Sequence, residues 1–184
     1  MKIYCASRNG LDGSAAVYSL LRYAFCIEYG DRDLPRIDKT PNGKPYFRDR
    51  CDIHFSLSHS RTHVLCALSN EPVGADIESP RQLNERVIRF FCSPEELIMF
   101  DPLDLWVLKE SYIKLVGGTM AMLKELRFSR EGDTILAPDN AVKSGLYSID
   151  GCRAAICSIG KPPPASIESV NWTSSGLGTN IFVT

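Results

Sequence analysis

The sequence predicts an α+β protein made of two similar α+β halves. Residues 14–30 carry apolar side chains at the 3.6-residue spacing of one helix face. Short strand-like runs follow between residues 53 and 78, separated by brief turns, as in an antiparallel meander. A second helical stretch, residues 102–116, precedes further short strands between residues 126 and 159. Helix with strands therefore occurs twice along the chain.

Composition limits the classes of function. The chain has 184 residues, of which 44% are hydrophobic and 23% charged, so it can bury a core as one domain or two closely packed halves. A net charge of −1 gives no general attraction to nucleic acid. No apolar run approaches the roughly 18–20 residues needed to cross a bilayer. Because Met1–Ala6 reads as a first strand and not as a signal peptide, we expect a cytoplasmic protein.

The cysteines and histidines do not predict a metal or disulfide framework. The 7 cysteines include no C-x-x-C pair, and most lie in apolar surroundings, so we expect reduced thiols. His59 and His63 have the spacing of a helical zinc pair, but they flank a strand-like segment and lack further ligands nearby. We therefore do not predict zinc.

Turn residues delimit the elements of the first half. Ser14 is a candidate N-cap for the helix that Gly30 ends. Thr40–Pro45 reads as a rigid loop, because its prolines fix φ and Gly43 permits a tight turn. Three strands are then expected, Ile53–Ser58, Val64–Leu68 and Val73–Glu78.

Two carboxylates share one face of the last of these strands. Alternation along a strand places Asp76 and Glu78 on the same side, with Ile77 on the other. Neighbouring carboxylates repel each other, so a cation is a natural occupant of that face.

The second half begins with helical segments. Pro80 opens one, and Ser93–Glu96 forms a capping box that starts another. Asp101-Pro102 starts a third, which Gly117 terminates. On that helix Glu110 and Lys114 lie on one face together with Trp106 and Ile113. Glu110 would thus supply a third carboxylate, and the three carboxylates with adjacent lysines suggest a magnesium-dependent phosphate reaction.

We place the limits of the units from these elements. Residues 1–72 form the N-terminal half and residues 73–170 the C-terminal half. The tail, residues 171–184, is rich in Ser, Gly, Thr and Asn, and we expect it to be loosely ordered.

Four motifs occur in order along the middle of the chain. They are Pro41-Asn42-Gly43-Lys44-Pro45, Phe55-Ser56-Leu57-Ser58-His59-Ser60, Val73-Gly74-Ala75-Asp76-Ile77-Glu78 and Trp106-Val107-Leu108-Lys109-Glu110-Ser111-Tyr112-Ile113-Lys114. Together they resemble the 4'-phosphopantetheinyl transferases, and more narrowly the broad-specificity, surfactin-synthetase-activating type.

The resemblance implies a fold and a reaction. It implies a pseudo-two-fold monomer that binds coenzyme A between its halves. It implies transfer of phosphopantetheine from coenzyme A to a serine of an apo acyl, peptidyl or aryl carrier protein, with release of 3',5'-ADP. The partners would be coenzyme A and the carrier, with neither nucleic acid nor membrane.

The resemblance also implies roles for individual residues. Asp76, Glu78 and Glu110 would hold Mg²⁺. Lys44, Ser58 and His59 match positions that contact coenzyme A, and Lys114 matches a lysine on the phosphate side. The residue types allow Glu110 to act as general base, His59 to donate to phosphate, and Lys114 or Lys109 to stabilise the leaving group. The sequence leaves open which lysine does so, and whether Glu110 is base or only ligand.

The N-terminal region departs from this type, which usually carries a longer N-terminal region with a basic helix near the 3'-phosphate of coenzyme A. The candidate substitutes are Arg8, Arg22, Arg32, Arg36 and Lys39. An alternative hypothesis is therefore a non-catalytic module with the same fold that binds coenzyme A or a carrier protein. A weaker one is another Mg²⁺-dependent nucleotide or phosphate transferase.

Overall fold

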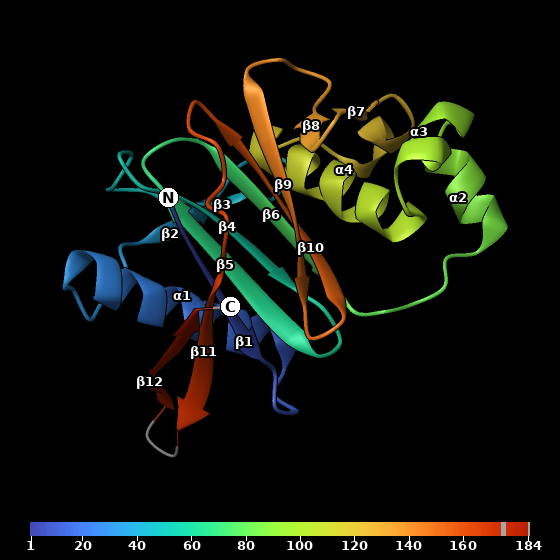
Figure 1. Cartoon of the computed structure of the whole chain (residues 1–184). Coiled ribbons are helices and arrows are strands. Elements are labelled where there is room, and N and C mark those ends of the chain that lie inside the picture. Colours follow the sequence, from blue (N-terminus) through green and yellow to red (C-terminus); the bar gives the residue numbers. More distant parts are fainter. Residues whose placement is uncertain (174–175, 184) are drawn as a thin grey trace.

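The protein is a four-layer α+β structure (Figure 1). The computed structural model describes residues 1–173 and 176–183. Helix α1 (Gly13–Tyr29) covers one face of a first sheet, and helix α4 (Pro102–Val116) covers one face of a second sheet. The remaining faces of the two sheets pack against each other. The predicted α+β class is confirmed.

The first sheet has the strand order β12-β11-β1-β5-β4. Its strands are β1 (Lys2–Ser7), β4 (His54–His59), β5 (His63–Ser69), β11 (Glu168–Thr173) and β12 (Gly176–Val183). Strand β1 runs antiparallel to β5 and parallel to β11, so the C-terminal end of the chain completes a sheet that begins at the N-terminus. A separate hairpin joins β2 (Ile37–Lys39) to β3 (Pro45–Phe47).

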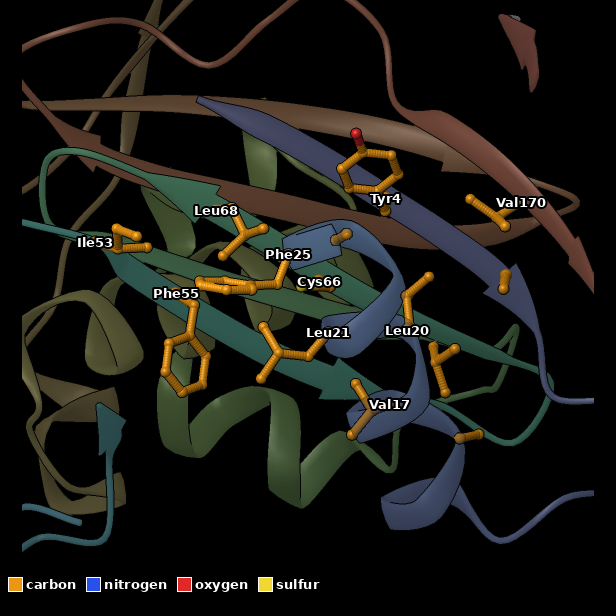
Figure 2. Packing of buried hydrophobic residues seen from close by; sticks show 14 of the residues in the cluster. Tyr4, Val17, Leu20, Leu21, Phe25, Ile53, Phe55, Cys66, Leu68 and Val170 are labelled. Atoms are coloured by element: carbon orange, nitrogen blue, oxygen red, sulfur yellow. The ribbon is translucent and has the colours of Figure 1, made fainter. Parts of the chain in front are cut away.

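Helix α1 packs on this sheet mainly through apolar residues (Figure 2). Its helical spacing brings Val17, Leu20 and Leu21 against Phe55 and Leu68 of the strands. Asp12, and not the predicted Ser14, is the N-cap, because its carboxylate accepts a hydrogen bond from Ala15 N. Gly30 ends the helix as predicted, in the left-handed conformation with φ 73°.

The second sheet has the strand order β6-β10-β9-β8-β7. Its strands are β6 (Val73–Glu78), β7 (Ser129–Glu131), β8 (Thr134–Leu136), β9 (Val142–Ile149) and β10 (Cys152–Ile159). The other helices of this half are α2 (Glu85–Phe91), α3 (Pro94–Met99) and a short 3₁₀ helix, η1 (Met120–Lys124). Helix α4 lies across β6 and β10 and buries Leu105, Val107 and Leu108 completely.

The two sheets meet along a seam between their edge strands β4 and β6. The hydroxyl of Ser56 accepts a hydrogen bond from Ala75 N at 2.9 Å, and the hydroxyl of Ser58 accepts one from Ile77 N at 3.3 Å. Serine side chains therefore accept hydrogen bonds from backbone N–H groups at the outer edge of β6, whose other edge pairs with β10. Apolar residues of the two facing sheets, such as Leu65 and Ile156, complete the contact.

Several predicted boundaries needed correction. The helix expected from Pro80 begins only at Glu85, since Asn84 supplies its cap, and residues 126–128 are not a strand. The expected tail from Asn171 instead contains the end of β11 and all of β12, whose main chains pair; residues 174, 175 and 184 lie outside the described part. The domain limits themselves stay a prediction, although β6 begins at the predicted residue 73.

Over the described residues, the structure holds no helix with both the length and the apolar character needed to cross a membrane.

Candidate functional site

The candidate site lies where α4 crosses β6. Gly74, Asp76 and Glu78 alternate along β6 and face the helix. Gly74 permits the close approach, because a Cβ there would lie 1.9 Å from Ser111 O and 2.4 Å from Leu115 N. The backbones of strand and helix therefore touch two residues before Asp76.

Asp76 is the centre of a polar cluster. It is 5% exposed, and its Oδ1 accepts hydrogen bonds from Ser58 Oγ at 2.7 Å and from Lys114 Nζ at 2.7 Å. Lys114 Nζ also donates to Ser58 Oγ at 3.0 Å. The structure thus brings together three residues predicted from separate motifs, which lie on one strand of each sheet and on helix α4.

Burial and the negative charge of Asp76 raise the pKa values of the two other predicted carboxylates. Burial, together with Asp76, raises the pKa of Glu110 to about 7, against the opposing effect of Lys114. Burial and the same neighbour raise the pKa of Glu78, although Arg81 forms an ion pair with it at 3.0 Å. Both pKa shifts are typical of carboxylates that are partly buried near another carboxylate, with too little positive charge nearby to balance them.

The donor set of this cluster fits a hard divalent cation. Asp76 Oδ2 is buried and has no hydrogen-bond partner among the described residues. A cation that prefers oxygen ligands would satisfy that atom and relieve the repulsion that raises the pKa values of Glu78 and Glu110. In the present arrangement, however, no three His, Cys, Asp or Glu side chains of the described residues are grouped so as to hold a metal ion. The ammonium of Lys114 lies beside Asp76 instead.

Lys109, which the sequence left open as the lysine that stabilises the leaving group of coenzyme A, is not part of this cluster. Its side chain is 0% exposed and lies on the far side of α4, where Nζ contacts Glu96 at 2.9 Å and Phe91 O. Glu96 also accepts from Ser93 N and Phe128 N. Lys109 is therefore a core residue that connects α4 to α3, and it does not belong to the candidate site.

His59 lies at the end of β4, next to Ser58, and is exposed. Its imidazole packs over Gly13, where an added Cβ would lie 2.8 Å from Nδ1. His59 thus sits at the first turn of α1, separated from the carboxylates by Ser58. No described contact joins His59 to Glu110, so its predicted catalytic role stays a prediction.

Lys44 reaches the site region from the Thr40–Pro45 loop, but its amine is engaged by main-chain atoms. Nζ donates to Leu115 O at 2.8 Å and to Val73 O at 3.4 Å. Burial lowers the pKa of Lys44 to about 8. A cavity of about 210 Å³ lies between this loop and the end of α4, with Lys44 and Lys114 in its wall.

The basic residues named as candidates for the 3'-phosphate of coenzyme A have separate locations. Arg8 donates to Leu11 O at 2.7 Å and to Ser60 O at 3.1 Å, which places it beside the hairpin that follows His59. Arg36 contacts Asp38 at 3.4 Å on the exposed β2–β3 hairpin. The structure therefore brings Arg8, and not Arg36, to the end of β4.

Sequence reasoning missed Gly74, which helps to build this site, and the role of Glu96, which holds the opposite side of α4. Gly74 lies two residues before Asp76, so its place on the same strand face was available from alternation, but its close contact with α4 was not. Glu96 was assigned only to the capping box. Its buried pairing with Lys109 depends on tertiary packing of α3 against α4.

Comparison with known proteins gives a consistent result. A family model described as the 4'-phosphopantetheinyl transferase superfamily matches residues 72–144, which include Asp76, Glu78, Glu110 and Lys114.

Individual relatives extend this match. The chain is 28% identical over 177 residues to the 4'-phosphopantetheinyl transferase Sfp of Bacillus subtilis (strain 168), covering 87% of this chain and 78% of the relative. It is 38% identical over 92 residues to the 4'-phosphopantetheinyl transferase gsp of Aneurinibacillus migulanus, covering 45% of this chain and 38% of the relative. It is 33% identical over 146 residues to the 4'-phosphopantetheinyl transferase psf-1 of Bacillus pumilus, covering 70% and 61% respectively. For gsp and psf-1 the matched part is therefore less than two thirds of the relative.

The ordered motifs, the α+β fold and these matches agree, and the predicted resemblance to the 4'-phosphopantetheinyl transferase superfamily is confirmed.

Proposed function

We propose that this protein transfers the 4'-phosphopantetheine group of coenzyme A to a serine hydroxyl of an apo carrier protein. The serine oxygen forms the new bond to the β-phosphorus of coenzyme A, the pyrophosphate P–O bond breaks, and 3',5'-ADP leaves. The observation that carries this proposal is buried Asp76, which pairs with Lys114 and lies close enough to the half-buried Glu78 and Glu110 to raise their pKa values, within the part of the chain that matches the family model.

Glu110 is the proposed general base. Without a bound cation, burial beside Asp76 raises the pKa of Glu110 to about 7; a cation held by these carboxylates would lower it, so Glu110 would then be ionised and able to accept a proton. In this role Glu110 accepts the proton that the carrier serine loses as its oxygen bonds to phosphorus.

Lys114 and Ser58 are the proposed phosphate-binding groups. Lys114 is half-buried and its ammonium can donate to phosphate oxygens, where it offsets the charge that develops on the leaving 3',5'-ADP. Ser58 Oγ is 3.0 Å from Lys114 Nζ, so the two donors can act on one phosphate. His59, exposed next to Ser58, extends this donor set toward α1.

Asp76, Glu78 and Glu110 are the proposed ligands of Mg²⁺. When bound, the ion would neutralise pyrophosphate charge and polarise the phosphoryl oxygens. The unpartnered Oδ2 of Asp76 supports this assignment, as does the hard oxygen chemistry of the three side chains.

The test is the gain in mass of an apo carrier protein incubated with coenzyme A and Mg²⁺. We expect transfer by the wild-type protein and a loss on the order of 10³-fold in Asp76→Ala and Glu110→Ala. Glu131→Ala is the matched control, since Glu131 is an exposed carboxylate on β7, and it should transfer normally. Normal transfer by Asp76→Ala would contradict the proposed metal site.

Two further measurements distinguish the transferase from the alternative functions. Calorimetric binding of coenzyme A without any mass gain on acyl, peptidyl and aryl carriers would favour a non-catalytic binding module. Release of a product other than 3',5'-ADP would indicate a different phosphate transferase.

We also propose that the protein is cytoplasmic and acts as a monomer; the monomer is supported by a candidate site that is assembled from two sheets of one chain. Light scattering in solution tests the oligomeric state. A mass of twice the chain mass at micromolar concentration would contradict the proposed monomer.

A further inference from the structure

The C-terminal end of α4 is held by a loop from the other half of the molecule. A helix ends with carbonyl groups that lack intrahelical N–H partners. In α4 both Gly117 N and Gly118 N turn back to Ile113 O, which leaves the later carbonyls to find other donors. Two side chains of the loop Thr40–Pro45 supply such donors.

Asn42 and Lys44 are the donors. Asn42 Nδ2 donates to Gly117 O at 2.9 Å, and Lys44 Nζ donates to Leu115 O at 2.8 Å. Lys44 Nζ also lies 3.4 Å from Val73 O at the start of β6. One ammonium therefore connects the loop, the helix end and the strand that carries Asp76.

Hydrogen bonds within the loop fix its conformation. Gly43 N donates to Thr40 O at 2.8 Å, and Thr40 N donates to Lys44 O at 2.9 Å. Lys44 N donates to Thr40 Oγ1 at 3.1 Å, and Gly43 adopts φ 87°, which an L side chain rarely does. Lys44 thus projects from a fixed turn.

The position of Lys44 has an electrostatic reason. Carbonyl dipoles make the C-terminus of a helix partly negative, so a cation there is favourable. No ion pair joins Lys44 to a carboxylate in residues 1–172, whose side chains the structure describes, so its ammonium serves the carbonyls.

The contact point lies close to the catalytic residues. Leu115 follows Lys114 directly, and Val73 precedes Gly74, where β6 and α4 touch. Moving the end of α4 away from Val73 would therefore move Lys114 and Glu110 away from Asp76.

We infer that Asn42 and Lys44 form a clamp, the loop clamp, that positions α4 on β6 and so sets the geometry of Glu110 and Lys114. Lys44 is in this view a positioning residue, in place of the coenzyme A contact that its motif predicts. The kinetic part of this inference rests on the proposed transferase function; the structural part does not.

Hydrogen exchange followed by mass spectrometry tests the structural part. Lys44→Met keeps the aliphatic stem and loses the ammonium, whereas Asn42→Ala removes an exposed amide. We expect faster exchange in peptides covering residues 105–118 in both variants. Lys39→Met, which removes an exposed lysine from the adjoining strand β2, is the control and should exchange like wild type. Unchanged exchange in Lys44→Met and Asn42→Ala would overturn the loop clamp.

Steady-state kinetics test what the loop clamp does. A displaced α4 lowers kcat, by about tenfold or more, because misplacement of catalytic groups slows the chemical step. KM for coenzyme A should stay within about twofold, and Lys44→Arg should recover part of kcat. A raised KM with an unchanged kcat would instead make Lys44 a coenzyme A contact and overturn the inference. If wild type shows no transfer, the proposed function fails, while the exchange experiment still decides on the loop clamp.

Discussion

Helices α1 and α4 each cover one sheet, but they do so with different chemistry. Every residue that α1 buries is apolar or glycine, although its half-buried Glu28 accepts a hydrogen bond from Tyr4 of β1. Helix α4 buries Asp104, Lys109 and Ser111 together with its apolar residues. Asp104 forms an ion pair with Arg153, and Lys109 one with Glu96.

The two helices are therefore held on their sheets in different ways, α1 mainly by apolar packing and α4 by buried polar contacts as well. An apolar face fixes a helix on a sheet but tolerates small sliding, since dispersion and burial have little directionality. Buried charge pairs with defined geometry fix rotation and register as well. Glu110, adjacent to Lys109, forms no ion pair with the described residues, and burial beside Asp76 raises its pKa.

The largest expected effect is from Lys109→Met. It leaves the Glu96 carboxylate buried without its cation, and should lower the free energy of unfolding by about 3–5 kcal/mol in urea titrations. Arg22→Met on α1, where Arg22 is exposed, should change it by less than about 0.5 kcal/mol. Adding Glu96→Gln to Lys109→Met should restore part of the loss; equal stabilities of Lys109→Met and Arg22→Met would refute the distinction between the helices.

A glycine under each helix gives a second test. In Gly74→Ala the new methyl group meets the backbone of α4, which cannot move without moving the helix, so we expect a loss of about 2–3 kcal/mol. In Gly13→Ala the methyl group meets only the His59 ring, which can rotate, and the change should stay within about 1 kcal/mol. Thermal and urea unfolding of both variants measure this. Similar losses would show that the close approach at Gly74 has no special weight.

The smallest expected effect concerns pH. Because the folded state raises the pKa of Glu110 from 4.5 to about 7, folded protein holds a proton between these values that unfolded protein has lost. The contribution of Glu110 to stability therefore falls as pH rises from about 4.5 to 7.

Glu110→Gln removes this titration. Without added metal, the variant should gain about 1–2 kcal/mol over wild type across that interval, after allowance for solvent screening. Urea titrations at several pH values give the difference, and Glu131→Gln should show none. A difference that does not vary with pH would exclude Glu110 as the responsible group.

Local signals predicted much of this architecture. Asp101-Pro102 and Gly117 delimited α4 correctly because capping depends on a few adjacent residues. Alternation placed Asp76 and Glu78 on one strand face, and helical spacing placed Glu110 and Lys114 together.

The contacts of Lys109 and Lys44 depend on tertiary packing, which local sequence signals do not predict. Lys109 and Glu110 are neighbours in the chain yet lie on different faces of α4, and periodicity does not say which face meets α3. Lys44 presents the same difficulty, since its acceptors Leu115 O and Val73 O are distant in sequence. For α1, both Asp12 and Ser14 are good caps, and only the folded backbone distinguishes them.

Ser58 has one hydroxyl proton and three partners. It gives that proton to Asp76 Oδ1 and receives hydrogen bonds from Lys114 Nζ and Ile77 N, so its capacity is full. A ligand phosphate that takes this proton deprives Asp76 of one donor and leaves its carboxylate more available to a cation. If a phosphate binds at Ser58 and a cation at Asp76 as proposed, the two binding events would for this reason be thermodynamically linked, and each would strengthen the other.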